Sequence, residues 1–385
     1  RVAEGDLRDV RNGVSELTID LPRPMAIAHY LDVWLGHDGR NAYVLRKHFT
    51  VTRSYPYDDF TVLLWSYARG ETVTRRVQRA CYDLGTDMMD LCHIGSYSDV
   101  GAAREYAVAS RSGLWILPYV TRLAFDSRED HTLKPGLFET AWFESRRESM
   151  APACRQAAPY SPPAYTLGDE NYMSRGKHEF GAAPETMAAY RTFLRERYGT
   201  IDRLNAVWQT DHPRFAAIGR PVWLEEAAAL QDSYASWFDH RDFLDTGFAR
   251  AHETLADMVR EQDPRARVGW DGFLRYHWQA GYDFDKLTRN LELNQAYSSH
   301  PLQGELIRSL AGAEALTGEW GNQVADNEAG FSAIGWHNLF RGHNSVWWWT
   351  SWGCDYIPFN PDGSVSHMGE WFFRSMEEIK SGPGK

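Results

Sequence analysis

The sequence predicts an α/β protein whose main part is a (β/α)₈ TIM barrel, preceded by a short β-rich segment. From Asp59 onward, short apolar runs alternate with amphipathic helical stretches, which is typical of parallel strands joined by crossover helices. There are eight such runs, the number that closes this kind of barrel. A length of 385 residues suits one large barrel with insertions, and a hydrophobic fraction of 43% excludes a disordered chain.

Residues 1–58 differ from the rest of the chain. They contain β-rich stretches that are interrupted by prolines and a glycine turn, at Leu17–Leu21, Ala26–Leu35 and Asn41–Thr52. We interpret this segment as the last strands of an upstream β-domain. Because the chain begins at Arg1 within a polar stretch, we expect a fragment of a longer protein, and the compartment stays open.

The barrel is expected over residues 59–380, followed by a Gly/Pro-rich linker at 381–385. Its predicted strands are Thr61–Trp65, Met88–Cys92, Leu114–Tyr119, Ala164–Gly168, Arg267–Trp270, Leu291–Ala296, Ala315–Gly318 and Ser345–Thr350. Helices are expected between them at Thr74–Leu84, Val100–Ser110, Leu137–Arg155, Asp285–Asn290, Gln303–Ala311 and Phe331–Gly342. The long fourth connection adds helices at Pro184–Tyr198, Ile201–Trp208 and Glu225–Gln262, the last stopped by Pro264.

Composition and missing motifs exclude several classes of protein. A net charge of −11 disfavours non-specific nucleic-acid binding, and no apolar run reaches the roughly 18–20 residues of a membrane span. The sequence has no phosphate-binding or dinucleotide-binding glycine motif and no HExxH or GxSxG. The four cysteines, Cys81, Cys92, Cys154 and Cys354, have no zinc-site spacing and are expected to be buried free thiols. We therefore expect no cofactor and no metal.

Two glutamates stand where a barrel places its catalytic groups. Glu170 follows the fourth strand and Glu319 follows the seventh, and the carboxyl ends of all strands meet at one mouth. Glycoside hydrolysis needs such a pair, one carboxyl protonated to assist the leaving oxygen and one ionised to attack or to activate water. A single glutamate at a strand end is usually a solvated loop residue, so the pair carries more weight than either member.

Other polar residues compete for the same mouth. Asp169 precedes Glu170, and only one of the two is expected to face the centre if the segment is extended. Asp271, after the fifth strand, is a candidate substrate contact. Glu292, Glu314, Asp326 and Glu328 are expected to be structural, solvated or loop residues.

Aromatic residues make up 14% of the chain, and Trp alone accounts for 16 positions. Indole rings are suitable platforms for the apolar faces of sugars. We predict Trp320, Trp349 and Trp352 as platforms at the mouth, while Trp347 and Trp348 are expected in the core. Tyr297, His93 and Arg122, which end or follow other strands, are further candidate substrate contacts; for Tyr297 a hydrogen bond to an adjacent carboxylate and a packing role are both open.

The stretch after the fourth strand resembles a known family. It reads FLRERYGTI at 193–201 and LNAVW at 204–208. This is similar to the "RERYGT…LN..W" segment of the family 42 β-galactosidases, which belong to glycoside hydrolase clan A. A helical stretch at Trp237–Pro264 is also similar, so the likeness covers about residues 60–380 although its specific part is short.

The resemblance implies a retaining β-glycosidase with Glu170 as the acid/base and Glu319 as the nucleophile. The sequence departs from the family in three places. Asp169 stands where the clan has an Asn that helps hold the sugar 2-hydroxyl, and whether Asn171 replaces it is open. The cysteine cluster of some members is missing, so no structural zinc is implied. The β-rich segment before the barrel is also unlike the usual layout.

Two alternatives stay open at this point. One is an endo-acting polysaccharide hydrolase of the same clan, in which the long connection 171–266 shapes a cleft. The other is a noncatalytic carbohydrate-binding barrel. The expected partner is in each case an oligosaccharide or polysaccharide; the sugar, the linkage and the formation of a homo-oligomer are left open.

Overall fold

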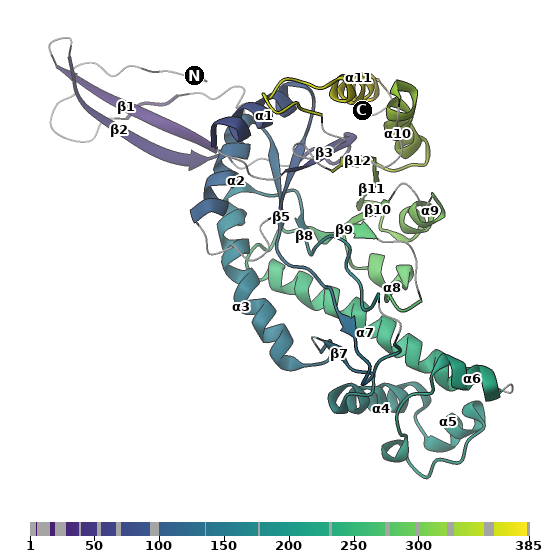
Figure 1. The fold of residues 1–385 in the computed structure, drawn as a ribbon. Coiled ribbons are helices and arrows are strands. Elements are labelled where there is room, and N and C mark those ends of the chain that lie inside the picture. The colour runs from purple at the N-terminus through teal and green to yellow at the C-terminus, as the bar shows by residue number, and fades with distance from the viewer. Residues whose placement is uncertain are drawn as a thin grey trace.

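The computed structural model describes residues 5, 16–19, 28–37, 40–51, 55–66, 71–92, 100–134, 136–175, 178–230, 233–273, 278–297, 301–321, 327–349 and 358–382. Its centre is a closed barrel of eight parallel strands in the order β10-β11-β12-β3-β4-β5-β8-β9 (Figure 1). These strands are β3 (Thr61–Ser66), β4 (Met88–Cys92), β5 (Trp115–Tyr119), β8 (Tyr165–Thr166), β9 (Val268–Phe273), β10 (Leu293–Tyr297), β11 (Leu316–Trp320) and β12 (Ser345–Trp348). Every strand predicted for the barrel is therefore confirmed, although several of them end at different residues.

A helix follows each strand and packs outside the barrel, as this fold requires (Figure 1). In chain order these helices are α1 (Glu71–Asp83), α2 (Val100–Ser112), α3 (Thr140–Ala157), α7 (Ala235–Arg260), α8 (Phe284–Thr288), α9 (Pro301–Leu310), α10 (Glu328–Phe340) and α11 (His367–Ser381). The sequence analysis missed α11. Ser366 caps its first turn, and Phe372, Phe373, Met376 and Ile379 are buried at helical spacing, so the signal was present.

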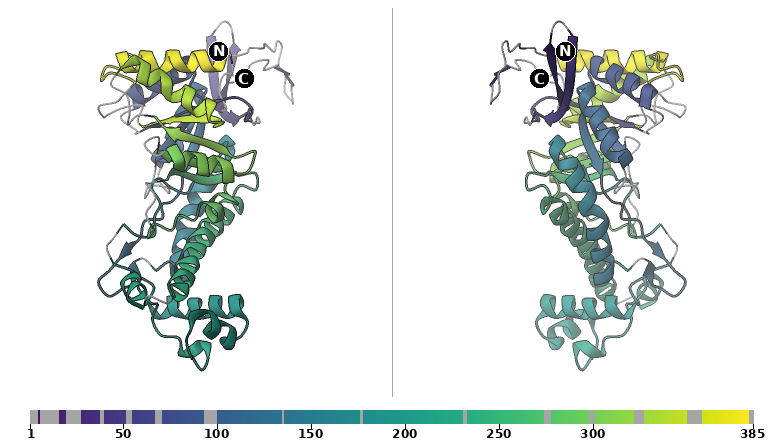
Figure 2. Two further views of the ribbon diagram at one scale, coloured as in Figure 1. Left: turned by 90° about the vertical axis from the view of Figure 1, so that its right-hand side faces the viewer. Right: turned by 90° about the vertical axis from the view of Figure 1, so that its left-hand side faces the viewer.

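The long fourth connection forms a helical extension at the end of α7 that lies far from the barrel (Figures 1 and 2). It contains α4 (Pro184–Tyr198), α5 (Ile201–Trp208), the 3₁₀ turn η2 (Phe215–Ala217) and α6 (Leu224–Leu230). Thr200 caps α5, and α4 and α5 have the predicted bounds. The single helix predicted over Glu225–Gln262 is instead two helices, α6 and α7, and Ser233 before α7 accepts a local hydrogen bond from the Ala235 N–H.

Smaller elements complete the described chain. The 3₁₀ turn η1 (Ala158–Tyr160) follows α3, and a short ribbon joins β6 (Asp126–Ser127) to β7 (Leu133–Lys134). Before the barrel, β1 (Ala28–His37) and β2 (Arg40–Thr50) form an antiparallel hairpin (Figure 1). Residues 16–19 carry no strand, unlike the predicted stretch Leu17–Leu21. That the hairpin belongs to an upstream β-domain stays a prediction. No helix in the described part of the chain combines the length and apolarity needed to span a membrane.

Strand alternation divides the barrel wall into two apolar layers. The inner layer fills the barrel and includes Leu63, Trp65, Leu316, Trp320 and Trp347. The outer layer packs strand residues against the helices, as Val346 and Trp348 do on β12. Because successive strand side chains point to opposite faces, the register of each strand decides which residues reach the mouth. The thiols of Cys81 and Cys154 lie buried and unpaired in the outer layer, as expected.

Candidate active site

A tight turn after β8 presents two carboxyl groups at the mouth of the barrel. Gly168 and Glu170 both have positive φ, 123° and 50°. Such a φ at a non-glycine residue costs on the order of 1–3 kcal/mol and is maintained only by surrounding contacts. The N–H of Asp169 donates to the Tyr119 hydroxyl at 2.8 Å. The Asp169 carboxylate lies against Gly272 of β9, where a Cβ would collide with it.

Asn171 is the main anchor of this turn. Its side chain is fully buried: Oδ1 accepts from the Leu123 N–H at 3.0 Å, and Nδ2 contacts the Leu167 carbonyl and His252 Nε2. Burial lowers the pKa of His252 to about 4, so this imidazole is neutral and can accept the amide proton. The prediction of Asn171 as a substrate contact is therefore wrong, because all its polar atoms are used inside the protein.

The hydroxyl of Tyr297 joins the two carboxyl groups. It lies 3.1 Å from Asp169 Oδ1 and 3.2 Å from Glu170 Oε1. The sequence analysis expected only one of these neighbours to face the centre. That expectation fails because Glu170 has a left-handed backbone, and alternation applies only to extended chain. The predicted bond from Tyr297 to a neighbouring carboxylate is present.

The two carboxyl groups have opposite electrostatic surroundings. Burial, with the nearby Asp271 and Glu170 carboxylates, raises the pKa of Asp169 well above its usual range, so a proton is favoured there. Glu170 instead contacts two guanidinium groups through one oxygen, Oε2: Arg122 Nη2 at 3.2 Å and Arg175 Nη2 at 2.8 Å. Neighbouring carboxyls in unlike electrostatic surroundings are the pattern expected of an acid–base pair.

Asp271 and Trp320 form the layer beneath this pair. Asp271 is fully buried, accepts from Thr166 Oγ1 at 2.8 Å, and receives the indole N–H of Trp320 on its backbone carbonyl. Trp320 is only 2% exposed and packs between Trp65 and Trp347. Neither residue is open to a ligand in this structure. The prediction of Trp320 as a sugar platform is therefore corrected to a packing role under the mouth.

Glu319 does not reach the mouth. It was predicted to follow the seventh strand, but β11 continues to Trp320, and Glu319 pairs within the sheet with Ala296 and Val346. Alternation then sends Trp320 inward and Glu319 outward. Its carboxylate lies against Gly304 of α9, and both of its oxygens are 3.3 Å from Nη1 of Arg341, which follows α10. The structure therefore does not bring Glu319 together with Glu170.

The surroundings of Glu319 explain its charge state. Its side chain is 3% exposed, and burial raises its pKa to about 7, although Arg341 opposes the shift. Nearby, His343 is buried with its pKa lowered to about 4, mainly by desolvation. Nδ1 of His343 lies 3.2 Å from the Thr317 hydroxyl. This group of ionisable residues belongs to the layer between barrel and helices.

The remaining predicted site residues have different outcomes. Trp349 is 38% exposed and follows the last residue of β12 at the mouth end, so its platform role stays a prediction. His93 and Trp352 lie outside the described residues. Arg122 contacts Glu170, and its role as a substrate contact stays a prediction. Two functional residues were not predicted: Arg175, and Tyr119, whose hydroxyl accepts from the turn. The only sequence signal for Arg175 was its position five residues after Glu170.

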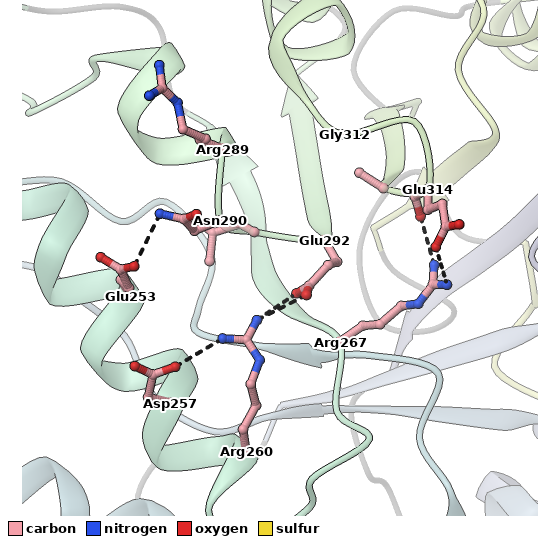
Figure 3. A pocket seen from close by; sticks show the side chains of 11 residues that line it. Glu253, Asp257, Arg260, Arg267, Arg289, Asn290, Glu292, Gly312 and Glu314 are labelled. Atoms are coloured by element: carbon pink, nitrogen blue, oxygen red, sulfur yellow. Dashed lines mark hydrogen bonds and ion pairs between the residues drawn. The ribbon is translucent and has the colours of Figure 1, made fainter.

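A pocket of about 440 Å³ lies at the opposite end of the barrel, where strands begin (Figure 3). It contains Glu292 and Glu314, which the sequence analysis set aside. Glu292 pairs with Arg260, and Glu314 pairs with Arg267. In this fold the face where the strands begin serves stability, and these paired charges fit that role.

Among the described residues, no cluster of three or more His, Cys, Asp or Glu side chains could hold a metal ion. No family model matches the chain, and a search of curated protein sequences found no relative.

Solved structures with the same fold do match. A β-galactosidase from the psychrophilic Marinomonas ef1 has a TM-score of 0.64 and 14% identity over 83% of this chain and 59% of its own. The catalytic domain of a Paenibacillus polymyxa β-amylase has a TM-score of 0.66 and 14% identity, covering 84% and 99%. An exo-carrageenase from Bacteroides ovatus has a TM-score of 0.54 and 13% identity, covering 84% and 49%. The chain thus spans only part of the β-galactosidase and the carrageenase, and likeness at this identity shows the shared barrel fold.

Proposed function

We propose that this protein is a retaining glycoside hydrolase that cleaves β-glycosidic bonds, with Asp169 and Glu170 as its catalytic carboxyl pair. The observation that carries the proposal is the contact of both side chains with the single hydroxyl of Tyr297 at the carboxyl ends of the strands. The names of the similar structures, β-galactosidase, β-amylase and exo-carrageenase, support a carbohydrate substrate.

The roles follow from the surroundings of each carboxyl. Asp169, with its raised pKa, is the proton donor to the glycosidic oxygen. Glu170, which contacts Arg122 and Arg175, attacks the anomeric carbon as the bond to the leaving oxygen breaks. The Asp169 carboxylate then accepts a proton from water, and the resulting hydroxide displaces Glu170 from the glycosyl-enzyme.

The spacing supports a double displacement. An inverting pair needs about 6.5–9.5 Å between carboxyl groups so that water fits between them, whereas a retaining pair needs about 5–5.5 Å. Here one oxygen of each carboxyl lies within 3.2 Å of the same hydroxyl, which limits these two oxygens to a separation of about 6.3 Å, below the lower end of the inverting range. The proposed outcome is still the retained configuration that the sequence predicts, but the catalytic pair is Asp169 and Glu170 in place of Glu170 and Glu319. Glu319 is not carried forward as nucleophile, because its carboxylate faces Arg341 and α9.

The test is a glycan-panel hydrolysis assay with NMR detection of the first anomer released. The panel includes aryl β-galactosides, β-linked oligosaccharides and β-linked polysaccharides. We expect the wild-type enzyme to release product of retained configuration. E170Q and D169N should each lower kcat about 10²–10⁴-fold. E261Q, which alters an exposed glutamate paired with Arg147, is the matched control and should keep wild-type turnover.

Azide separates the two roles. In E170A, azide should attack in place of the missing carboxylate and yield a glycosyl azide of inverted configuration. Inverted sugar from the wild-type enzyme, or near wild-type turnover in E170Q, would contradict the proposal. Sugar binding without hydrolysis across the whole panel would favour the noncatalytic barrel instead.

A further inference from the structure

Two arginines converge on one oxygen of Glu170. Nη2 of Arg175 lies 2.8 Å and Nη2 of Arg122 lies 3.2 Å from Glu170 Oε2. Their side chains are 48% and 35% exposed, so both arginines are partly accessible at the mouth. A single carboxylate oxygen does not need two cations for its position, because one bidentate arginine would hold both oxygens.

Among the described residues of this rim, two guanidinium groups converge on one carboxylate oxygen. Burial raises the pKa of the neighbouring Asp169, which disfavours its charged form. Asp271 adds a carboxyl group, but it is fully buried beneath the turn and bonds to Thr166. The described part of the rim therefore presents two guanidinium groups beside Glu170, on a protein whose net charge is −11.

The guanidinium groups also have unused donors. Each arginine has five N–H donors in a planar fork, and each gives Glu170 a bond from one terminal nitrogen. Nε of Arg122 is buried without a hydrogen-bond partner among the described residues. The Arg175 guanidinium stacks over the Tyr172 ring at 4.3 Å, which fixes the plane of its fork.

We propose that Arg122 and Arg175 bind an anionic substituent, a sulfate ester or a uronate carboxylate, on the sugar next to Glu170, so that the substrate class is an anionic glycan. The inference rests on the proposed function, because it uses the same mouth. Sulfate and carboxylate oxygens match the spare guanidinium donors in pairs, whereas a neutral hydroxyl accepts one bond and balances no charge.

The first experiment measures substrate preference. Wild-type enzyme is assayed on a carrageenan tetrasaccharide, its desulfated counterpart, an oligogalacturonide and a neutral galacto-oligosaccharide. We expect kcat/KM for one anionic substrate to exceed that for its neutral counterpart at least tenfold. R175Q should reduce this ratio toward one, mainly through KM, and R175K should retain part of it. R147Q, an exposed arginine paired with Glu261, is the control and should keep the ratio.

The ratio separates ligand binding from a purely positioning role. If the arginines only hold Glu170, R175Q lowers activity on anionic and neutral substrates by the same factor, and the proposal is overturned. Comparing the sulfated carrageenan tetrasaccharide with the oligogalacturonide identifies which anion causes the preference. A preference for neutral substrates in the wild-type enzyme would also overturn it.

The second experiment measures binding without turnover. Calorimetry on D169N titrates the same four oligosaccharides at low and high salt. We expect tighter binding of the anionic member, weakened by salt, and loss of the difference in D169N/R175Q. Anion-selective binding with no hydrolysis of any glycan by the wild-type enzyme would contradict the proposed function and support this site. Hydrolysis of neutral glycans, together with equal affinity for the anionic and the neutral oligosaccharides, would support the proposed function and contradict the anion site.

Discussion

The hydroxyl of Tyr297 lies 3.1 Å from Oδ1 of Asp169 and connects the end of β10 to the turn after β8. The same hydroxyl reaches Glu170, so one phenol group controls how two adjacent carboxyl groups share the mouth. Its hydrogen bond lowers the pKa of Asp169, against the larger raising effect of burial. Five expected outcomes follow from this turn and from the outward position of Glu319.

Tyr297→Phe removes the hydroxyl and keeps the ring that stacks on Trp320. Because the lost bond lowers the pKa of Asp169, the variant raises this pKa further, and Asp169 stays protonated to higher pH. We expect kcat/KM to fall about 10–100-fold, the value of a hydrogen bond to a charged group, while its alkaline limit moves upward. The measurement is the pH profile of kcat/KM. An unchanged alkaline limit with lower activity would show that the phenol only packs.

Glu319→Gln tests whether this carboxylate takes part in the reaction. Since it faces Arg341 outside the barrel wall, we expect kcat to stay within about tenfold of wild type, against the much larger loss of a missing nucleophile. Azide should produce no glycosyl azide in Glu319→Ala. Azide rescue of that variant would return the nucleophile to Glu319 and contradict the position described for it.

The same residue predicts a pH dependence of stability. The pKa of Glu319 is raised from 4.5 to about 7, so the folded state holds this proton more tightly than the unfolded chain does. Wild type should therefore lose stability as pH rises from about 4.5 to about 7, by on the order of 2–3 kcal/mol. Glu319→Gln stays neutral and lacks this loss. Urea unfolding of both proteins at pH 5 and pH 8 measures the difference in their free energies of unfolding, which should favour the variant at pH 8. The same pH dependence in both proteins would contradict a buried Glu319 that is hard to ionise.

Asn171→Ala distinguishes an anchor from a sugar contact. The substitution leaves the Leu123 N–H buried without its acceptor, so we expect the free energy of unfolding to fall by about 2–4 kcal/mol. Activity should fall through kcat, because the turn that presents Glu170 loses its support. Thermal unfolding and Michaelis kinetics measure both effects. A raised KM with wild-type stability would instead support the original sugar-binding role.

Gly304→Ala examines the contact between α9 and β11. A methyl group at this position would collide with Glu319 Oε1, which the ion pair with Arg341 holds in place. We expect a loss of about 1–3 kcal/mol despite the better helix propensity of alanine. Gly312→Ala, where nothing lies within 4 Å, is the matched control. Combining Gly304→Ala with Glu319→Ala should cancel most of the cost; additive losses would mean that the two residues do not touch.

The barrel itself was predictable from the sequence because its signals are local. Each strand is a short apolar run, and the bounds of α4 and α5 follow from Pro184 and the Thr200 cap. The position of Glu170 beyond the fourth strand also came from this pattern. Strand ends were less certain, and an error of two residues at β11 moved Glu319 from the mouth to the outer face.

The sequence by itself determined that eight β/α units close a barrel and that acidic residues follow its fourth strand, because periodicity and breakers act over a few residues. Only the tertiary structure decided which of them share the mouth. Ladder register turned Trp320 inward and Glu319 outward, and the left-handed backbone at Glu170 brought it beside Asp169. The partners that set each charge, Tyr297 and Arg175 among them, come from separate segments and meet only when the barrel closes.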